Sequence, residues 1–313
     1  MNIIVDAMGG DNAPDAIVQG ALLASRESAH NIVLVGLKEE IKACVEKYAE
    51  DGDRPPLVVG ASQAISNNEP AARAVRAKKD SSMAVGLNIV KDGMGSVFIS
   101  AGSTGALLAG ALTVLGRIKG INRPAICSVY PVIGREASLL VDAGANSECK
   151  ARHLLQFGIM GSLYMEKVLG RPNPRVALVN VGAESKKGTA LTREAYELLS
   201  ESGLNFCGNI EARELPRGGC DVIVADGFTG NVILKLTEGM GEVFMKMLGA
   251  SSADSARELD YTQYGGAPIL GVSKPVIKMH GSSNAKAVKN AILRGIDFAE
   301  GRVVELIKRH LEK

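Results

Sequence analysis

The sequence predicts an α/β protein in which a mainly parallel sheet carries helices on both faces. Short runs rich in β-branched residues alternate along the chain with longer segments of 3.6-residue periodicity. Such alternation is typical of parallel strands covered by helices. Nine runs are expected as strands, at residues 3–6, 32–35, 57–59, 97–100, 125–129, 139–142, 176–180, 222–225 and 276–279.

Two helical segments can be predicted in more detail. In residues 11–28, Pro14 falls at the first helical position and Asp15 suits the positive end of a helix. The last segment carries the clearest apolar stripe, formed by Val288, Ile292, Ile296, Ala299, Val303, Ile307 and Leu311. Charged residues lie off this stripe, namely Lys289, Arg294, Glu300 and Lys308.

The composition excludes several classes of protein. The 313 residues are 46% hydrophobic and 22% charged, which is ordinary for a globular chain. A net charge of +2 and only six Phe, six Tyr and no Trp argue against nucleic-acid binding. No apolar run is long enough for a membrane span, no secretory signal begins the sequence, and the five cysteines show no CxxC pair. We therefore expect a cytoplasmic protein with reduced thiols.

No linker or repeat marks a domain boundary, so residues 1–313 are interpreted as one α/β catalytic unit. A length near 300 also allows two lobes that share a cleft.

Glycine-rich turns follow six of the predicted strands, at residues 6–11, 100–105, 142–146, 180–188, 226–231 and 280–284. Ligands bind beyond the C-terminal ends of parallel strands. Glycine lets backbone N–H groups approach an anion, and Ser, Thr and Asn add donors. A single turn of this kind is more often a helix N-cap. Six at equivalent positions predict a shared anion site, with candidate residues Asp6, Gly9, Gly10, Asp11, Gly102, Ser103, Thr104, Gly105, Asp142, Asn146, Asp226, Thr229, Gly230, Gly281, Ser282, Ser283 and Asn284.

The standard nucleotide and metal motifs are absent. There is no P-loop, no G-x-G-x-x-G after the first strand, no G-x-S-x-G and no HExxH or Cys/His cluster. The sequence therefore predicts neither a cofactor nor a metal. Among the four histidines, His280 alone stands at a strand end.

Six segments together resemble the PlsX-type acyl-ACP:phosphate acyltransferases. In chain order they are IIVDAMGGDNAP, ISAGSTGALLAG, LLVDAGAN, VADGFTGNVILKLTEG, YGGAPILGV and HGSSNAKAVKNAI. The resemblance implies a fold similar to the isocitrate and isopropylmalate dehydrogenases and to phosphotransacetylase. It also implies a cleft between lobes and a homodimer as the working unit.

The resemblance further implies the reaction. Inorganic phosphate attacks the thioester of a long-chain acyl-acyl carrier protein and gives an acyl phosphate, which feeds a glycerol-3-phosphate acyltransferase in phospholipid synthesis. Because phosphate is already anionic, the enzyme need only position the reactants and stabilise the oxyanion. The alternatives are a CoA-dependent phosphate acyltransferase, a decarboxylating dehydrogenase on the same fold, and a non-catalytic metabolite-binding protein.

Three residues are expected to carry the chemistry. Lys187 matches the family's lysine before a glycine and would stabilise the oxyanion, with Lys186 as the neighbouring alternative. Asn231 ends the DGFTGN motif and would donate to the thioester carbonyl or to phosphate, unless it caps a helix. His280 would act as an acid or base, or would anchor a neighbouring turn.

The turn carboxylates would repel phosphate. We expect Asp6, Asp11, Asp142 and Asp226 instead to orient Lys187, His280 or backbone N–H groups, or to accept a proton from phosphate. The candidate hydroxyl donors to phosphate are Ser103, Thr104, Ser282 and Ser283.

Two surface features concern partners. A basic cluster would dock the acidic carrier protein, or else it is a solvated helix face; it consists of Arg73, Arg76, Lys78 and Lys79.

Family members usually have a longer, partly apolar helical hairpin after the TEGMG segment. In the family this hairpin is linked to dimer contacts and to peripheral attachment to the inner face of the membrane. Here residues 249–259 form a short, mostly polar projecting segment.

Overall fold

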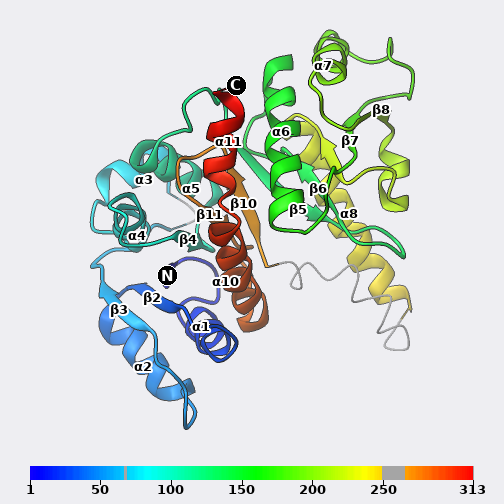
Figure 1. Cartoon of the computed structure of the whole chain (residues 1–313). Coiled ribbons are helices and arrows are strands. Elements are labelled where there is room, and N and C mark those ends of the chain that lie inside the picture. The colour runs from blue at the N-terminus through cyan, green and yellow to red at the C-terminus, as the bar shows by residue number, and fades with distance from the viewer. Residues whose placement is uncertain (67–68, 249–264, 313) are drawn as a thin grey trace. The chain divides into compact units, whose positions relative to one another are not determined.

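The computed structural model describes residues 1–66, 69–248 and 265–312 (Figure 1). Its contacts divide the chain into two compact units. Unit 1 comprises Met1–Ile118 and Tyr261–Val304, and unit 2 comprises Lys119–Asp260 and Glu305–Lys313. The shortened segment predicted at 249–259 lies outside the described residues.

The sheet of unit 1 is mainly parallel. Its strand order is β3 (Leu57–Gly60), β2 (Asn31–Gly36), β1 (Asn2–Asp6), β4 (Val97–Ser100), β11 (Val276–Lys278) and β10 (Ala267–Leu270). Strand β10 runs antiparallel to β11, and the other described pairs are parallel. The carboxyl ends of β1, β4 and β11 therefore meet at one edge of this sheet.

Helices cover both faces of the unit 1 sheet. Alternate residues of β4 point to opposite faces. A Cβ built on Gly295 of α10 (Ala285–Glu300) would lie 2.8 Å from Ile99, whereas one on Gly86 of α4 (Ser82–Lys91) would lie 2.2 Å from Phe98. Helix α1 (Asp15–Glu27) packs closely along α10 (Figure 1). The other helical elements are α2 (Lys38–Tyr48), α3 (Ala71–Ala77), α5 (Thr104–Gly110) and η1 (Ala111–Leu115).

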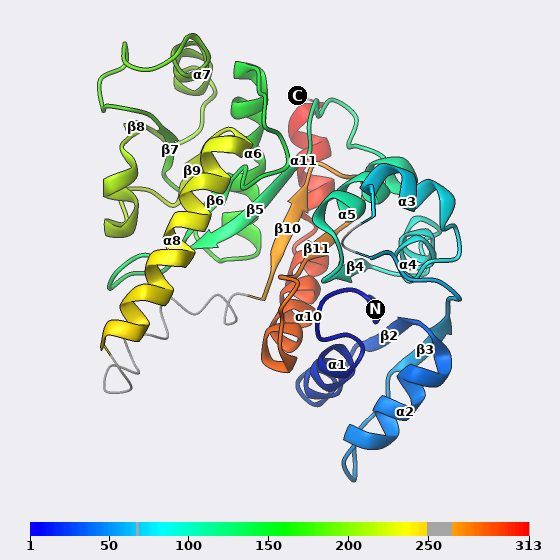
Figure 2. The same ribbon diagram turned by 180° about the vertical axis from the view of Figure 1, so that it is seen from behind.

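The sheet of unit 2 has the order β5 (Ala125–Tyr130), β6 (Ser138–Val141), β9 (Val222–Val224), β7 (Val176–Val179) and β8 (Phe206–Ile210). Strands β5 and β6 are antiparallel, and the remaining pairs are parallel. Figure 1 shows α6 (Ala151–Lys167) in front of this sheet, and the reversed view of Figure 2 shows α8 (Gly227–Leu248) in front. The other helical elements are α7 (Ala190–Ser200), which packs on α6, η2 (Ala212–Arg217) and α11 (Val303–Leu311).

The predicted fold class and all nine predicted strands are confirmed, with ends that differ by no more than one residue. Two strands were missed. Strand β8 (FCGNI) contains Gly and Asn and is only partly buried, and β10 (APIL) contains a proline. Both compositions are unfavourable for a strand, so tertiary packing decided these two elements.

Two helix details need correction. Pro14, predicted as the first helical residue, instead occupies the N-cap of α1, and the helix begins one position later at Asp15. The apolar stripe over 288–311 is divided between α10 and α11, because Gly301 ends α10 and Arg302 adopts a left-handed φ of 49°.

No helix within the described residues is long and apolar enough to cross a membrane.

Candidate active site

The predicted site residues fall into two sets of three turns. Unit 1 holds Asp6, Gly9, Gly10, Asp11, Gly102, Ser103, Thr104, Gly105, His280, Gly281, Ser282, Ser283 and Asn284. Unit 2 holds Asp142, Asn146, Lys187, Asp226, Thr229, Gly230 and Asn231.

In unit 1 the buried Asp6 ties together the ends of β1 and β4. Its Oδ2 accepts a hydrogen bond from Ser100 Oγ at 2.7 Å, and its Oδ1 accepts one from the Met8 N–H at 3.1 Å. Ser100 Oγ in turn accepts from the Gly102 N–H at 3.0 Å. Burial raises the pKa of Asp6, and its hydrogen bonds partly oppose this shift. The carboxylate thus shapes the two turns.

The three turns of unit 1 lie against one another. A Cβ on Gly9 would stand 2.6 Å from Gly102 N, so only glycine permits the approach of the first two turns. The Asp11 N–H donates to the Gly281 carbonyl at 2.8 Å, which joins the first turn to the third. Unit 1 therefore gathers the ends of β1, β4 and β11 as the sequence predicts.

Polar side chains of these turns bond mainly within their own segments. His280 Nδ1 lies 2.8 Å from Ser282 Oγ, and Ser283 Oγ donates to the His280 carbonyl at 2.7 Å. Asn284 caps α10 by accepting the Ala287 N–H at 2.9 Å, and Ser103 caps α5. The capping interpretation thus describes Asn284 and Ser103, whereas the exposed His280 and Ser282 lie at the surface.

Sequence reasoning missed a cation in this set of turns. Lys278, the last residue of β11, donates from Nζ to the Ala101 carbonyl at 3.3 Å and to the Met279 carbonyl. It therefore adds positive charge between two turns. The sequence could have indicated this cation, because a lysine ends a buried strand at a position where apolar residues are more common.

In unit 2 the buried Asp142 follows β6 and binds five donors. It accepts the N–H groups of Ile126 (3.0 Å), Gly144 (3.2 Å), Ala145 (3.0 Å) and Asn146 (2.8 Å), and the Asn146 side-chain amide (2.9 Å). Burial raises the pKa of Asp142, and these bonds partly oppose the shift. The carboxylate orients backbone donors, one of the roles expected for it.

Asp226 and Asn231 lie on the first turns of α8. Asp226 caps the helix, because its Oδ1 accepts the Thr229 N–H at 2.9 Å and its Oδ2 accepts Thr229 Oγ1 at 2.7 Å. The capping alternative for Asn231 is therefore wrong. A Cβ on Gly144 would lie 3.4 Å from Asn231 Oδ1, so this exposed amide stands beside the Asp142 turn.

Glycine allows this close approach. A Cβ on Gly230 would lie 1.9 Å from the Asp142 carbonyl oxygen, so any larger residue would push α8 away from the Asp142 turn.

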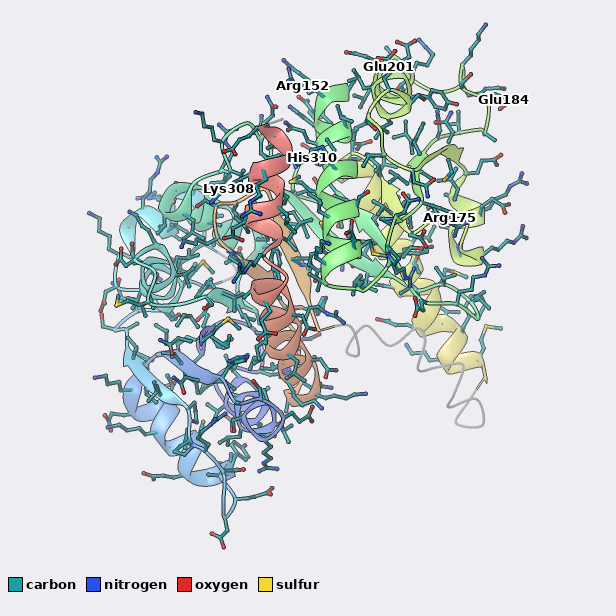
Figure 3. All side chains as sticks on the ribbon, viewed as in Figure 1. Arg152, Arg175, Glu184, Glu201, Lys308 and His310 are labelled. Atoms are coloured by element: carbon teal, nitrogen blue, oxygen red, sulfur yellow. The ribbon has the colours of Figure 1, made fainter. Side chains whose placement is uncertain are left out.

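The turn after β7 carries Lys186 and Lys187. Figure 3 labels a residue on each side of β7. Arg175 immediately precedes the strand, and Glu184 lies in the turn that follows it. Both lysine side chains are exposed. The backbone around Lys187 is fixed, because its N–H donates to the Glu184 carbonyl at 3.1 Å and its carbonyl accepts Asn180 Nδ2 at 3.1 Å.

A pocket of about 640 Å³ joins the turn after β7 to the start of α8. Its lining includes Asn180 and Gly188 from the first and Asp226 and Thr229 from the second. The sequence analysis did not anticipate this pocket. The pocket thus borders the segments that carry Lys187 and Asn231, although neither of these two residues is among its lining residues.

The comparisons with known proteins identify the family. The model described as "Fatty acid synthesis protein" matches residues 1–306. The chain belongs to this family. A phosphate acyltransferase of Alkaliphilus oremlandii is 50% identical to it over 98% of this chain and 96% of its own length. Another, of Clostridioides difficile, is 46% identical over 100% of this chain and 97% of its own length. The predicted family and the predicted enzyme class, an acyltransferase, are confirmed.

Solved structures confirm the fold of this fatty acid synthesis protein. A phosphotransacetylase from Streptococcus pyogenes matches with a TM-score of 0.69 at 18% identity, covering 96% of this chain and 93% of its own. A branched-chain phosphotransacylase from Enterococcus faecalis matches with a TM-score of 0.61 at 14% identity, covering 96% and 99%. At these identities the likeness concerns the fold alone.

Within the part of the chain that the structure describes, no three His, Cys, Asp or Glu side chains lie together in a way that could hold a metal ion. Burial raises the pKa of Cys149 to about 11 and that of Cys220 to about 12. Both thiols are therefore protonated near neutral pH and are poor nucleophiles.

Proposed function

We propose that this chain transfers a long-chain fatty acyl group from acyl-acyl carrier protein to inorganic phosphate. A phosphate oxygen bonds to the thioester carbonyl carbon, the carbon–sulfur bond breaks, and the thiolate takes a proton. The products are acyl phosphate and free carrier protein. The observation that supports this proposal is a cavity of unit 2 that is lined both by the turn after β7 and by the start of α8.

Lys187 and Asn231 supply the chemistry in this proposal. The Lys187 ammonium stabilises the negative charge of the tetrahedral intermediate. The Asn231 amide, beside the Asp142 turn, donates to the carbonyl oxygen of the thioester. Asp142 and Asp226 hold the backbone of these segments and stay away from the reacting atoms.

The turns of unit 1 offer a second set of polar groups, and in our proposal they contribute to anion binding. Ser282 and His280 are exposed there, Ser103 and Thr104 begin α5, and Lys278 adds positive charge. His280 would act there as a general acid or base.

The carrier protein is acidic, and its docking site in this proposal is the basic cluster of α3. Arg73, Arg76 and Lys79 are exposed. Lys78 is engaged within the fold, because its Nζ lies 2.7 Å from Glu69 and 2.8 Å from the Ala64 carbonyl. Docking therefore relies on three cations, and rim charges of this kind act mainly on the rate of association.

We assign the homodimer contact to the exposed apolar face of α8. The residues of this face follow one another at intervals of three or four, so they lie on one side of the helix. They are Phe228, Val232, Leu236, Met240, Val243 and Met247. A stripe this long is unusual on a monomer and marks an interface. The same face could instead contact the inner surface of the membrane, as the family resemblance implies. The acyl phosphate would then pass to a glycerol-3-phosphate acyltransferase.

The reaction is tested with purified protein and palmitoyl-acyl carrier protein, with and without phosphate. Carrier thiol should appear only with phosphate, and hydroxylamine should trap the acyl phosphate. Equal thiol release without phosphate would indicate a thioesterase and contradict the proposal. Palmitoyl-CoA in parallel tells whether the carrier protein is required.

The oligomer is tested by sedimentation of the wild type and of Leu236→Glu. A wild-type dimer that becomes a monomer in the variant supports the α8 contact. A wild-type monomer that floats with anionic vesicles would assign this face to the membrane instead.

A further inference from the structure

The pocket of unit 2 has walls that the proposed chemistry at Lys187 and Asn231 does not use. Its inner wall includes Leu154, Leu178 and Ala225, all buried side chains, and Leu191 of α7 lies beside them. Phe228 and Val181, which also line it, are 67% and 78% exposed. The buried side chains form the base beneath the cavity, and the accessible apolar carbon comes from Leu191, Phe228 and Val181.

Several polar groups of the lining are bonded within the protein, whereas Ser147 and Glu148, which also line it, are exposed. Thr229 donates to Asp226 from both its N–H and its hydroxyl. Thr189 Oγ1 accepts the Thr192 N–H at 3.2 Å, and Asn180 bonds the Lys187 carbonyl and the Val181 N–H. A wall of this kind makes little demand for polar partners, so it favours an apolar ligand.

The volume suits a long chain. A dry cavity of about 150 Å³ is enough for benzene, with six carbons. At about 640 Å³ the pocket has room for an alkyl chain well beyond the length of octanoate.

We propose that this pocket, between β7, β9, α6, α7 and the start of α8, holds the alkyl chain of the acyl group during transfer. The inference rests on the proposed function. The head of such a chain, the thioester carbonyl, would lie at the lining segments that carry Lys187 and Asn231. Leu191, a partly buried residue of this lining, then sets the chain length that the enzyme prefers.

The first test fills the pocket. Leu191→Trp should lower kcat/KM for hexadecanoyl-carrier protein about tenfold relative to octanoyl-carrier protein, since a pocket discriminates strongly between chains that fit and chains that do not. Ile133→Trp is the matched control, because Ile133 is an exposed aliphatic residue of unit 2 outside the pocket lining. An equal loss for both chain lengths, or no change, would overturn the assignment.

The second test needs neither turnover nor a variant. Cys149 lines the pocket, whereas the exposed Cys207 does not. At alkaline pH, where a larger fraction of Cys149 is thiolate, dodecylphosphonate below its micelle concentration should slow alkylation of Cys149 and leave Cys207 unaffected, whereas methylphosphonate should protect neither thiol. Absence of protection by dodecylphosphonate would contradict the chain site.

The two proposals fail in different ways. If wild-type protein releases no thiol in response to phosphate, the proposed function is contradicted, whatever the labelling of Cys149 shows. Active protein whose Cys149 stays unprotected fails only the location of the chain.

Discussion

The two units each bury one aspartate at a strand end, and they use it differently. In unit 1, Asp6 accepts the Ser100 hydroxyl and so links β1 to the neighbouring β4. In unit 2, Asp142 accepts three backbone N–H groups of its own turn, one from β5 and one side-chain amide. Asp6 therefore bonds a side chain of the next strand and one N–H of its own turn, whereas Asp142 binds three N–H groups of its own turn and also one of β5.

The difference explains where exposed functional groups lie in each unit. The turn that Asp142 folds stands beside Asn231, so a buried carboxylate fixes the surroundings of an exposed amide. The turns that Asp6 joins present hydroxyls, an imidazole and Lys278. Both aspartates are buried supports, and the exposed side chains around them carry the proposed chemistry.

The largest effect expected is that of Asp142→Ala. It leaves five donors without their acceptor in a buried turn, which should cost about 3–5 kcal/mol of unfolding free energy. Urea unfolding followed by circular dichroism measures the loss. Asp11→Ala, an exposed aspartate in a glycine-rich turn, is the control and should change stability far less. A loss below about 1 kcal/mol in Asp142→Ala would show that water replaces the carboxylate.

A smaller, pH-dependent effect is expected for Asp6→Asn. Because burial raises the pKa of Asp6 above its usual 3.8, the contribution of this carboxyl is complete below pH 3.8 and is lost as pH rises through the raised value. The wild type should therefore lose stability relative to Asp6→Asn as the pH rises above about 3.8. Unfolding curves across this range measure the difference.

Asp53 gives the opposite sign as a control. Its hydrogen bond with Arg26 lowers its pKa to about 2, so its contribution is present above 3.8 and is lost as pH falls through about 2. A stability difference for Asp6→Asn that moves in the same direction as that for Asp53→Asn would contradict the raised pKa of Asp6.

The sequence anticipated the strands and turns better than their internal bonding. Hydrophobic runs located nine strands, and the turns after six of them lie in two sets of three. The five donors of Asp142 could not be foreseen, because four are backbone N–H groups whose direction depends on the folded loop. The pocket was missed for a similar reason, since Leu154, Leu178 and Leu191 come from three separate elements.

The smallest effects expected are those of two helix caps. Asp226→Ala and Asn284→Ala each remove an N-cap, from α8 in unit 2 and α10 in unit 1, and each should cost about 1 kcal/mol of unfolding free energy. Only Asp226→Ala should also lower kcat, because α8 carries Asn231. Steady-state assays with unfolding curves on both variants make the measurement. Equal kcat losses in the two would show that kcat follows stability rather than the position of Asn231.

The central claim, that the exposed lysine of the turn after β7 carries the charge stabilisation, is tested most directly by comparing Lys187→Ala with Lys186→Ala. Both lysines are exposed neighbours in one turn, so their effects on folding should be small and alike. Phosphate-dependent turnover of palmitoyl-acyl carrier protein should fall by roughly 10²–10³ in kcat for Lys187→Ala. It should stay near the wild-type value for Lys186→Ala. Unchanged turnover in Lys187→Ala would contradict the account.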